Sequence, residues 1–346
     1  MHSENTDEAF MRAALAEAAK GLGHTSPNPA VGAVMVENGK IIARGHHRGP
    51  GSPHAEIKCL RSRRGNLPPH ATLYVTLEPC STTGRTPPCT EALVESGIHN
   101  VVVGALDVNP AHNGRGIKIL RDAGIAVRVN ILAHECAALN QAFNKWIVTG
   151  RPLVIAKCAM SLDGRLTRPP NEESWITSPA ARRHANRFRS QVDAILIGAE
   201  TLRTDDPQLT AREKNARQPW RVVLSRSGRL PKKARLFTDR FADKTIVFRG
   251  QPVEQVLIDL GQREITSVLI EGGGDVLGQA LDARLIDQVH LYFGPLFTGG
   301  PVIAFPGAGA AQTAAGARLR EIRYEQMGDD IFLSAQPTYS AVLPNN

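Results

Sequence analysis

Apolar residues recur along the chain in two patterns, short continuous runs and a repeat of one in every three to four positions. The runs predict buried strands, and the repeat predicts helices that cover them. Strands are expected at residues 31–36, 41–45, 71–77, 100–106, 153–160, 194–199, 221–225, 245–248, 267–274 and 288–294. Helices are expected at residues 7–20, 89–97, 116–124, 133–147, 179–190, 252–261 and 275–284. Strands that alternate with helices indicate an α/β layered sheet.

One further helix is expected to begin at Ser52-Pro53. Serine is a favoured N-cap, and proline suits the first helical position because its missing N–H would have no partner there. This start places His54 and Glu56 in the first turn of the helix.

The alternation of strands and helices pauses at "TGRP", residues 149–152, and then begins again. A chain of 346 residues is also longer than most single domains. We therefore expect two domains, residues 1–149 and 150–346, each an α/β structure with its own core.

Composition narrows the class of protein. The net charge of +8 suits anionic ligands, but the basic runs are short, which favours small phosphorylated molecules over nucleic acid. Five cysteines, an odd number in a long chain, do not suggest a disulfide framework. The N-terminus lacks the features of a signal peptide, and no apolar run is long enough to span a membrane. These features predict a cytoplasmic enzyme.

His54, Cys80 and Cys89 are candidate zinc ligands, because zinc prefers histidine and cysteine side chains. Three protein ligands leave a fourth position for water, whose pKa a bound zinc lowers to about 7. Glu56, two residues after His54, could move the proton of that water to a leaving amine. The order H-x-E and then Pro-Cys is the signature of zinc nucleobase deaminases, although eight residues rather than two separate the cysteines here.

The wider sequence resembles the deaminase domain of the bifunctional enzymes of riboflavin biosynthesis. The resemblance is carried by "SPNPAVGAV", "PHAE" and "VTLEPCS" followed by "GRTPPC". It implies a cytidine-deaminase-like three-layer α/β/α domain with zinc on His54, Cys80 and Cys89, Glu56 as proton donor and acceptor, and Asn28 facing the pyrimidine. The chain departs from the family at Thr82, where a histidine is usual.

The second half resembles the reductase domain of the same enzymes, through "KCAMSLDGR", residues 174–210, "VLIEGGG" and "GDDIFL". This implies a dihydrofolate-reductase-like domain that binds NADPH. The residues expected to line the cofactor are Ala159, Trp175, Thr201, Asp205, Gly273, Gly274, Asp275, Val276, Leu277, Gly278 and Gln279. Those expected to hold the substrate are Glu173, Arg189, Leu209, Arg212 and Glu271, with Ser174 as an alternative to Glu173.

Four further features of the second half bear on cofactor binding and hydride transfer. Residues 272–274 are glycines between a strand and a helix, so backbone N–H groups there could approach a phosphate. Leu277 stands where a Rossmann fingerprint needs glycine, so that fold is not expected. Ser225-Arg226 replaces the family's usual Asp-Ser, which leaves a cofactor contact at Arg226 open. Lys157 and Asp163 are expected to position groups for hydride transfer.

The resemblance implies two consecutive reactions. The first domain would deaminate 2,5-diamino-6-(5-phosphoribosylamino)pyrimidin-4(3H)-one, and the second would reduce the ribosyl chain with NADPH, giving 5-amino-6-(5-phosphoribitylamino)uracil. We expect a homo-oligomer with a small-molecule substrate and neither a nucleic-acid nor a membrane partner. Two alternatives stay open: a nucleic-acid base deaminase with an RNA-binding module, and a non-catalytic zinc scaffold closed by a fourth ligand such as Cys59 or His46.

Overall fold

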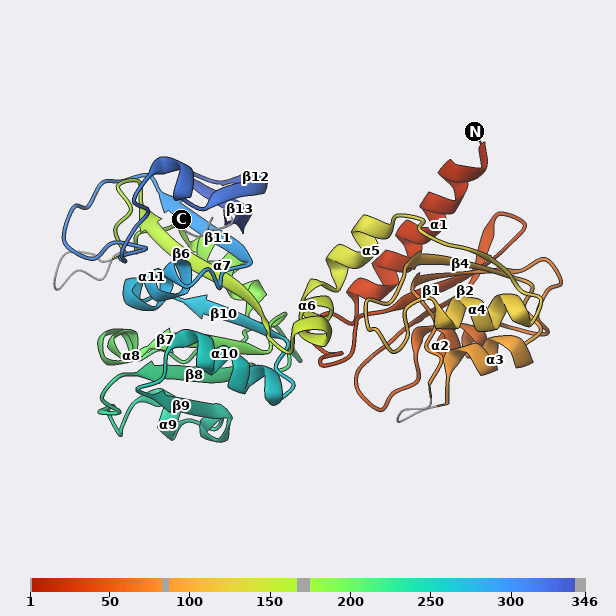
Figure 1. Cartoon of the computed structure of the whole chain (residues 1–346), viewed down its shortest axis with the longest axis horizontal. Helices are drawn as coiled ribbons and strands as arrows, with labels where there is room; N and C mark the ends of the chain where they lie inside the picture. The colour runs from red at the N-terminus through yellow and green to blue at the C-terminus, as the bar shows by residue number, and fades with distance from the viewer. Residues whose placement is uncertain (1, 83–86, 167–174, 340–346) are drawn as a thin grey trace, which may run out of the picture. The chain divides into compact units, whose positions relative to one another are not determined.

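The computed structural model of the chain describes residues 2–82, 87–166 and 175–339 (Figure 1). The chain divides into two compact units, residues 1–150 and 151–346. Both units combine helices with a layered sheet, which confirms the predicted α/β class. Among the described residues, no helix is both long and apolar enough to cross a lipid bilayer.

The first unit is built on one sheet with helices on both faces (Figure 1). Within the described residues its strands lie in the order β2 (Lys40–His46), β1 (Gly32–Glu37), β3 (Thr72–Leu77), β4 (Asn100–Ala105) and β5 (Ala126–Arg128). Its helices are α1 (His2–Ala19), α2 (Ala55–Ser62), α3 (Cys89–Glu95), α4 (Arg115–Asp122), α5 (Ala133–Leu139) and α6 (Gln141–Thr149). β1 pairs antiparallel with both neighbours, whereas β3, β4 and β5 are parallel.

Successive residues of β1 point to opposite faces of this sheet, so the strand is buried on both sides. Ala33 and Met35 pack with the apolar residues of α2, α3 and α4. Val34 and Val36 pack with residues of α1 and α5. The unit is therefore a three-layer α/β/α structure.

α2 lies unusually close to β2. A β-carbon on Gly45 would lie 2.3 Å from the carbonyl oxygen of Ala55, so a larger residue in β2 would push the helix away. The start of α2 differs from the prediction: the helix begins at Ala55, and His54 is its N-cap. An N-cap residue has an extended backbone. His54 has this backbone conformation, so it takes the N-cap position that was expected for Ser52.

The helix predicted at residues 133–147 is in fact two helices, α5 and α6, which meet at Asn140. The Asn140 side chain is buried and accepts from the Ala30 N–H at 2.7 Å while donating to the Ala30 carbonyl at 3.0 Å. This tertiary contact overrides the continuous helical pattern, and it also fixes the backbone that follows Asn28.

The second unit contains a larger and mostly parallel sheet (Figure 1). Its described strands lie in the order β12 (Arg318–Met327), β13 (Asp330–Thr338), β11 (Gln288–Gly294), β6 (Leu153–Ser161), β10 (Ser267–Glu271), β7 (Ala194–Gly198), β8 (Trp220–Ser225) and β9 (Thr245–Arg249). β13 runs antiparallel to β11, and β12 runs antiparallel to β13. The helices are α7 (Pro179–Phe188), α8 (Ala199–Asp205), α9 (Arg235–Thr238), α10 (Val253–Gln262) and α11 (Gly274–Asp282), with short 3-10 turns at Ala242–Lys244 and Thr313–Ala315.

The prediction for this unit is wrong at the end of one strand, and it lacks another strand. The strand predicted at residues 267–274 ends at Glu271, because Gly272 and Gly273 adopt positive φ angles and turn the chain into α11. The ten-residue strand β12 was not predicted at all. Nine of its ten residues are exposed, so it lacks the apolar alternation by which a half-buried strand is recognised.

Candidate metal centre and candidate reductase pocket

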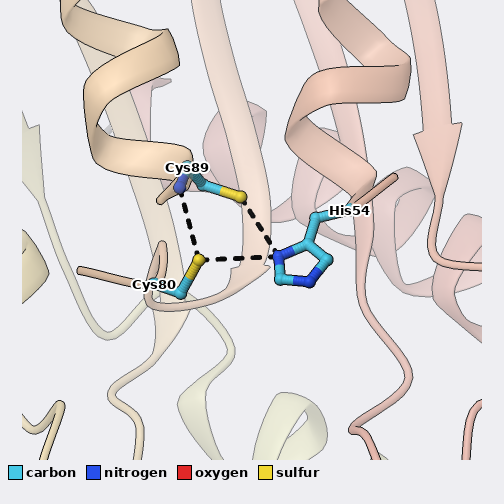
Figure 2. Close-up of side chains that lie close together, drawn as sticks. All are labelled: His54, Cys80 and Cys89. Atoms are coloured by element: carbon cyan, nitrogen blue, oxygen red, sulfur yellow. Dashed lines mark hydrogen bonds between the residues drawn. The ribbon is translucent and has the colours of Figure 1, made fainter. Parts of the chain in front are cut away.

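Three side chains of the first unit converge on one point (Figure 2). The Nδ1 atom of His54 lies 3.2 Å from the sulfur of Cys89 and 3.5 Å from that of Cys80. All three donor atoms lie within 4.8 Å of one another. Tetrahedral zinc with bonds of about 2.0–2.3 Å requires donor atoms roughly 3.5 Å apart, so the trio fits a zinc ion.

Each donor is held by the start or the end of a regular element. His54 caps α2, Cys89 is the first residue of α3, and Cys80 follows β3 (Figure 2). The Cys89 backbone N–H donates to the Cys80 sulfur at 3.3 Å. Hydrogen bonding, above all with the Cys89 side chain, lowers the pKa of Cys80, which favours its thiolate form. A thiolate beside a second cysteine and a histidine offers the ligands that zinc prefers.

The backbone before Cys80 is anchored by a buried carboxylate, Glu78. Glu78 accepts backbone hydrogen bonds from Gly114 at 2.9 Å and Gly116 at 2.8 Å, at the start of α4. A β-carbon on Gly116 would lie 2.2 Å from the Pro79 carbonyl oxygen, so this approach also needs glycine. Glu78 and α4 therefore fix the segment that presents Cys80.

Glu56 lies in the first turn of α2, beside the three donors, and is 3% exposed. Burial raises the pKa of Glu56 to about 7, and its carboxylate also hydrogen-bonds to the Cys89 side chain. A carboxyl group with this pKa can both take and give a proton near neutral pH.

Asn28 lies on the loop before β1, and its Nδ2 atom is 3.2 Å from Nε2 of His47. The His47 ring in turn packs edge-on against the His54 ring, with centroids 5.2 Å apart. Asn28 is thus linked through His47 to the same cluster. Thr82, the departure from the family pattern, is exposed.

The two candidate fourth ligands of the scaffold hypothesis are occupied elsewhere. Cys59 is fully buried in the core beneath α2, and burial raises the pKa of its thiol to about 12. His46 pairs with Glu17 at 3.3 Å. Among the described residues, the metal-ligating group contains only His54, Cys80 and Cys89, which leaves the coordination open.

The second unit contains a pocket of about 310 Å³ between α7 and the sheet. Its lining residues are Lys157, Trp175, Arg182, Ala185, Asn186, Arg189, Arg212 and Glu271. Four of these were predicted from the sequence as cofactor or substrate residues: Trp175, Arg189, Arg212 and Glu271. The pocket brings four cationic side chains together around one carboxylate, as an anionic ligand with several hydroxyl groups would require.

Arg189 and Glu271 form a bidentate ion pair in this pocket, with nitrogen–oxygen distances of 2.7 and 2.6 Å. Burial opposes ionisation of Glu271, but the charge of Arg189 outweighs it and holds the pKa of Glu271 below its usual value. Arg189 is therefore already paired, and Lys157, Arg182 and Arg212 are the cations that face the rest of the pocket.

Sequence reasoning missed Arg182 and Asn186. Both line the pocket from successive turns of α7, together with Arg189 at its C-cap. Positions 182, 186 and 189 are four and three residues apart, the spacing of one helix face, so the pattern could have identified them. Arg182 also lies over the Trp175 ring, 4.8 Å from its centroid.

The other predicted cofactor residues lie around the carboxyl ends of the strands. Thr201, in α8, lies next to Gly273, whose added β-carbon would be 3.0 Å from the Thr201 hydroxyl oxygen. Asp205 ends α8. Gly274 begins α11, in which Val276, Leu277 and Gly278 are buried while Gln279 donates to Asp275 at 3.1 Å.

The remaining predicted residues that the structure describes are not among those that line the pocket. Ala159 packs against an aromatic cluster that includes Tyr292 and Phe332. Leu209 is buried and is not among the residues that line the pocket. Glu173, with its alternative Ser174, lies outside the described residues. Arg226, the departure at the end of β8, forms an exposed ion pair with Asp275 at 2.8 Å.

Comparisons with known proteins identify a family for both halves of the chain. The sequence model described as the cytidine and deoxycytidylate deaminase zinc-binding region matches residues 4–105, and that of the RibD C-terminal domain matches residues 152–333. The riboflavin biosynthesis protein RibD of Actinobacillus pleuropneumoniae is 38% identical, over 95% of this chain and 94% of its own length.

Solved structures give the same result. Acinetobacter baumannii RibD matches with a TM-score of 0.89 and 38% identity, covering 97% of this chain and all of the other. A diaminohydroxyphosphoribosylaminopyrimidine deaminase/5-amino-6-(5-phosphoribosylamino)uracil reductase from Thermotoga maritima matches with a TM-score of 0.87 and 34% identity, covering 98% of this chain. The chain, with its deaminase zinc-binding region and its reductase domain, therefore belongs to the RibD family of riboflavin biosynthesis.

Proposed function

We propose that this chain catalyses two consecutive steps of riboflavin biosynthesis. Residues 1–149 deaminate 2,5-diamino-6-(5-phosphoribosylamino)pyrimidin-4(3H)-one, and residues 150–346 reduce the ribosyl chain of the product with NADPH. The observation that carries the proposal is the open cluster of His54, Cys80 and Cys89 beside the buried Glu56, in one chain with a cationic pocket.

In the deaminase site, His54, Cys80 and Cys89 hold the zinc ion and leave one side of it to water and substrate. Zinc, when bound, supplies Lewis-acid activation of the attacking water. Glu56 would take a proton from the attacking water as the water oxygen bonds to the amine-bearing ring carbon, and would give a proton to the amine, so that the C–N bond breaks and ammonia leaves. Asn28 orients the pyrimidine through its side-chain amide, whose direction is set by its contact with His47.

In the reductase site, Arg212 and Arg189 hold the phosphorylated substrate together with Glu271, Leu209 and Glu173. Arg212 suits the phosphate because a guanidinium group can bind it bidentately, whereas Arg189 contacts the substrate as part of its pair with Glu271. The cofactor lies along the glycine turn and α11, residues 273–279, and against Ala159, Trp175, Thr201 and Asp205. NADPH supplies the hydride, and the protein positions it against the sugar carbon.

The proposed function is tested with purified protein and the diaminopyrimidinone phosphate, following ammonia release and NADPH absorbance in separate assays. We expect ammonia first and NADPH oxidation only after it. Ammonia without NADPH oxidation would remove the reductase half of the proposal, and the absence of both would remove all of it. RNA binding that weakens steeply with salt would instead favour the base-deaminase alternative.

We also propose that the protein is a homo-oligomer that pairs through β12. Among the strands that the structure describes, β12 forms one edge of the larger sheet, where a further strand could pair with it. It carries exposed apolar side chains at Leu319, Ile322 and Tyr324, the last 69% exposed. The three exposed apolar side chains on this otherwise charged strand are a surface that a second copy of the chain would cover. A cytoplasmic location stays a prediction from the sequence.

We expect the double substitution Ile322→Lys and Tyr324→Lys to convert the oligomer to a monomer, because lysine on an edge strand opposes strand pairing. The mass is measured by size-exclusion chromatography with light scattering. Ile42→Lys is the matched control, since Ile42 is an exposed apolar residue on β2, an edge of the other sheet. An unchanged mass of the double variant, or a monomeric wild type, would contradict pairing through β12.

A further inference from the structure

Apolar side chains gather in the exposed loops at the carboxyl ends of β6 and β11. Leu162 follows β6, and Leu296, Phe297, Val302 and Ile303 follow β11, and all are at least 37% exposed. Phe297 is the most exposed of them, at 77%. We call these five residues the apolar collar. In an open parallel sheet, ligands bind outside the carboxyl ends of the strands, which is where the collar lies.

The collar is held together by one carboxylate, Asp163. Its Oδ1 atom accepts from the Ser161 hydroxyl at 2.5 Å and from the Thr298 N–H at 3.2 Å. Its Oδ2 atom accepts from the Gly299 N–H at 2.8 Å. The hydrogen bond from Ser161 is the largest cause that lowers the pKa of Asp163 to about 2, so the group is ionised at every working pH. These bonds join the turn after β6 to the segment that carries Phe297.

The same segment contacts both parts of the expected cofactor site. A β-carbon on Gly274, the first residue of α11, would lie 2.2 Å from the Ile303 carbonyl oxygen. A β-carbon on Gly294 would lie 1.9 Å from the carbonyl oxygen of Ile176, which follows Trp175. The collar therefore lies between the glycine turn and Trp175, a residue that lines the pocket.

We propose that Asp163 is a positioning residue for NADPH: it holds residues 296–300 so that the collar packs against the nicotinamide end of the cofactor. The inference rests on the proposed reductase function. The nicotinamide must lie beside the substrate, hence beside Trp175, and the collar is the exposed apolar surface adjacent to it. Apolar groups there exclude water from the dihydronicotinamide ring, whereas Asp163 itself touches neither cofactor nor substrate.

The test measures the NADPH dissociation constant of the full-length protein by quenching of its tryptophan fluorescence. Asp163→Asn keeps the shape of the side chain but weakens the charge-assisted bonds to the loop, and we expect about a tenfold weaker NADPH affinity. Phe297→Ala, at a residue too exposed to affect folding, should weaken binding about fivefold. Because both changes act through one segment, the double variant should bind no more than about twofold more weakly than Asp163→Asn.

Asp282→Asn is the matched control. Asp282 is an exposed carboxylate that, like the half-buried Asp163, anchors loop backbone: it accepts from the Ala308 N–H at 3.0 Å, beyond the collar. We expect this variant to bind NADPH like the wild type. In Asp163→Asn the KM for NADPH should rise in parallel with the dissociation constant, while ammonia release should not change.

The outcomes separate this inference from the proposed function. A wild type that does not bind NADPH would overturn the reductase proposal and the role of Asp163 with it. A wild type that binds, together with an Asp163→Asn variant of equal affinity, would overturn only the role of Asp163. Equal losses of affinity in Asp163→Asn and Asp282→Asn would assign Asp163 a general structural role and overturn the inference as well.

Discussion

Glu56→Gln is expected to lower the rate of ammonia release about a thousandfold while zinc stays bound. The amide has the size of the carboxyl group, so it occupies the same buried position in the first turn of α2. It cannot accept a proton from the attacking water or deliver one to the leaving amine, and proton transfer of this kind contributes about 10²–10⁴-fold to a rate. Glu56 is outside the trio of donor atoms, so the metal content should not fall.

The chain offers a closely matched control for this variant. Glu91 stands two residues after Cys89, as Glu56 stands two residues after His54, but Glu91 is exposed. Glu91→Gln should leave ammonia release and zinc content unchanged. Zinc is measured by elemental analysis of the purified variants, and the reductase step is assayed with the deaminated product as substrate. Normal ammonia release by Glu56→Gln would remove Glu56 from the mechanism, and loss of zinc would make it a ligand.

The metal centre could be predicted from the sequence because its chemistry is local. His54 and Glu56 belong to one helix start, and only eight residues of the sequence separate Cys80 from Cys89. The types of residue and their order are enough to indicate zinc, and the fold has only to bring two segments together. The exact start of α2 was not predicted, because Ser52-Pro53 has the residues of a helix start while the extended backbone of an N-cap lies at His54.

The reductase pocket was only partly predictable, because its residues come from distant segments. Arg189 and Glu271 are 82 positions apart, and no local sequence pattern predicts their ion pair. The resemblance to the family supplied these two residues, but it assigned them to the substrate and not to each other. Arg182 and Asn186 were missed although their helical spacing from Arg189 was visible, since polar residues on one helix face more often meet solvent.

Breaking the Arg189–Glu271 pair is expected to have the largest effect on stability. In Arg189→Met the carboxylate of Glu271 loses its partner, although it is only 8% exposed. Removing one partner of a buried ion pair costs about 3–5 kcal/mol, and the nearby charges of Lys157 and Arg212 favour the lower end of that range for the loss of free energy of unfolding of the second unit. NADPH oxidation should also be lost. Stability is measured by urea denaturation, and Arg203→Met, in an exposed pair with Glu200, should cost less than about 1 kcal/mol.

A second substitution separates stability from function. Arg189→Met combined with Glu271→Leu removes both charges, and replacing a buried ion pair by apolar residues is often neutral or stabilising. We therefore expect the double variant to regain most of the lost free energy of unfolding while NADPH oxidation stays absent, because the substrate has lost two of its proposed polar partners, Arg189 and Glu271. Recovery of NADPH oxidation along with stability would mean that the pair only maintains the fold, and that Lys157, Arg182 and Arg212 suffice to hold the substrate.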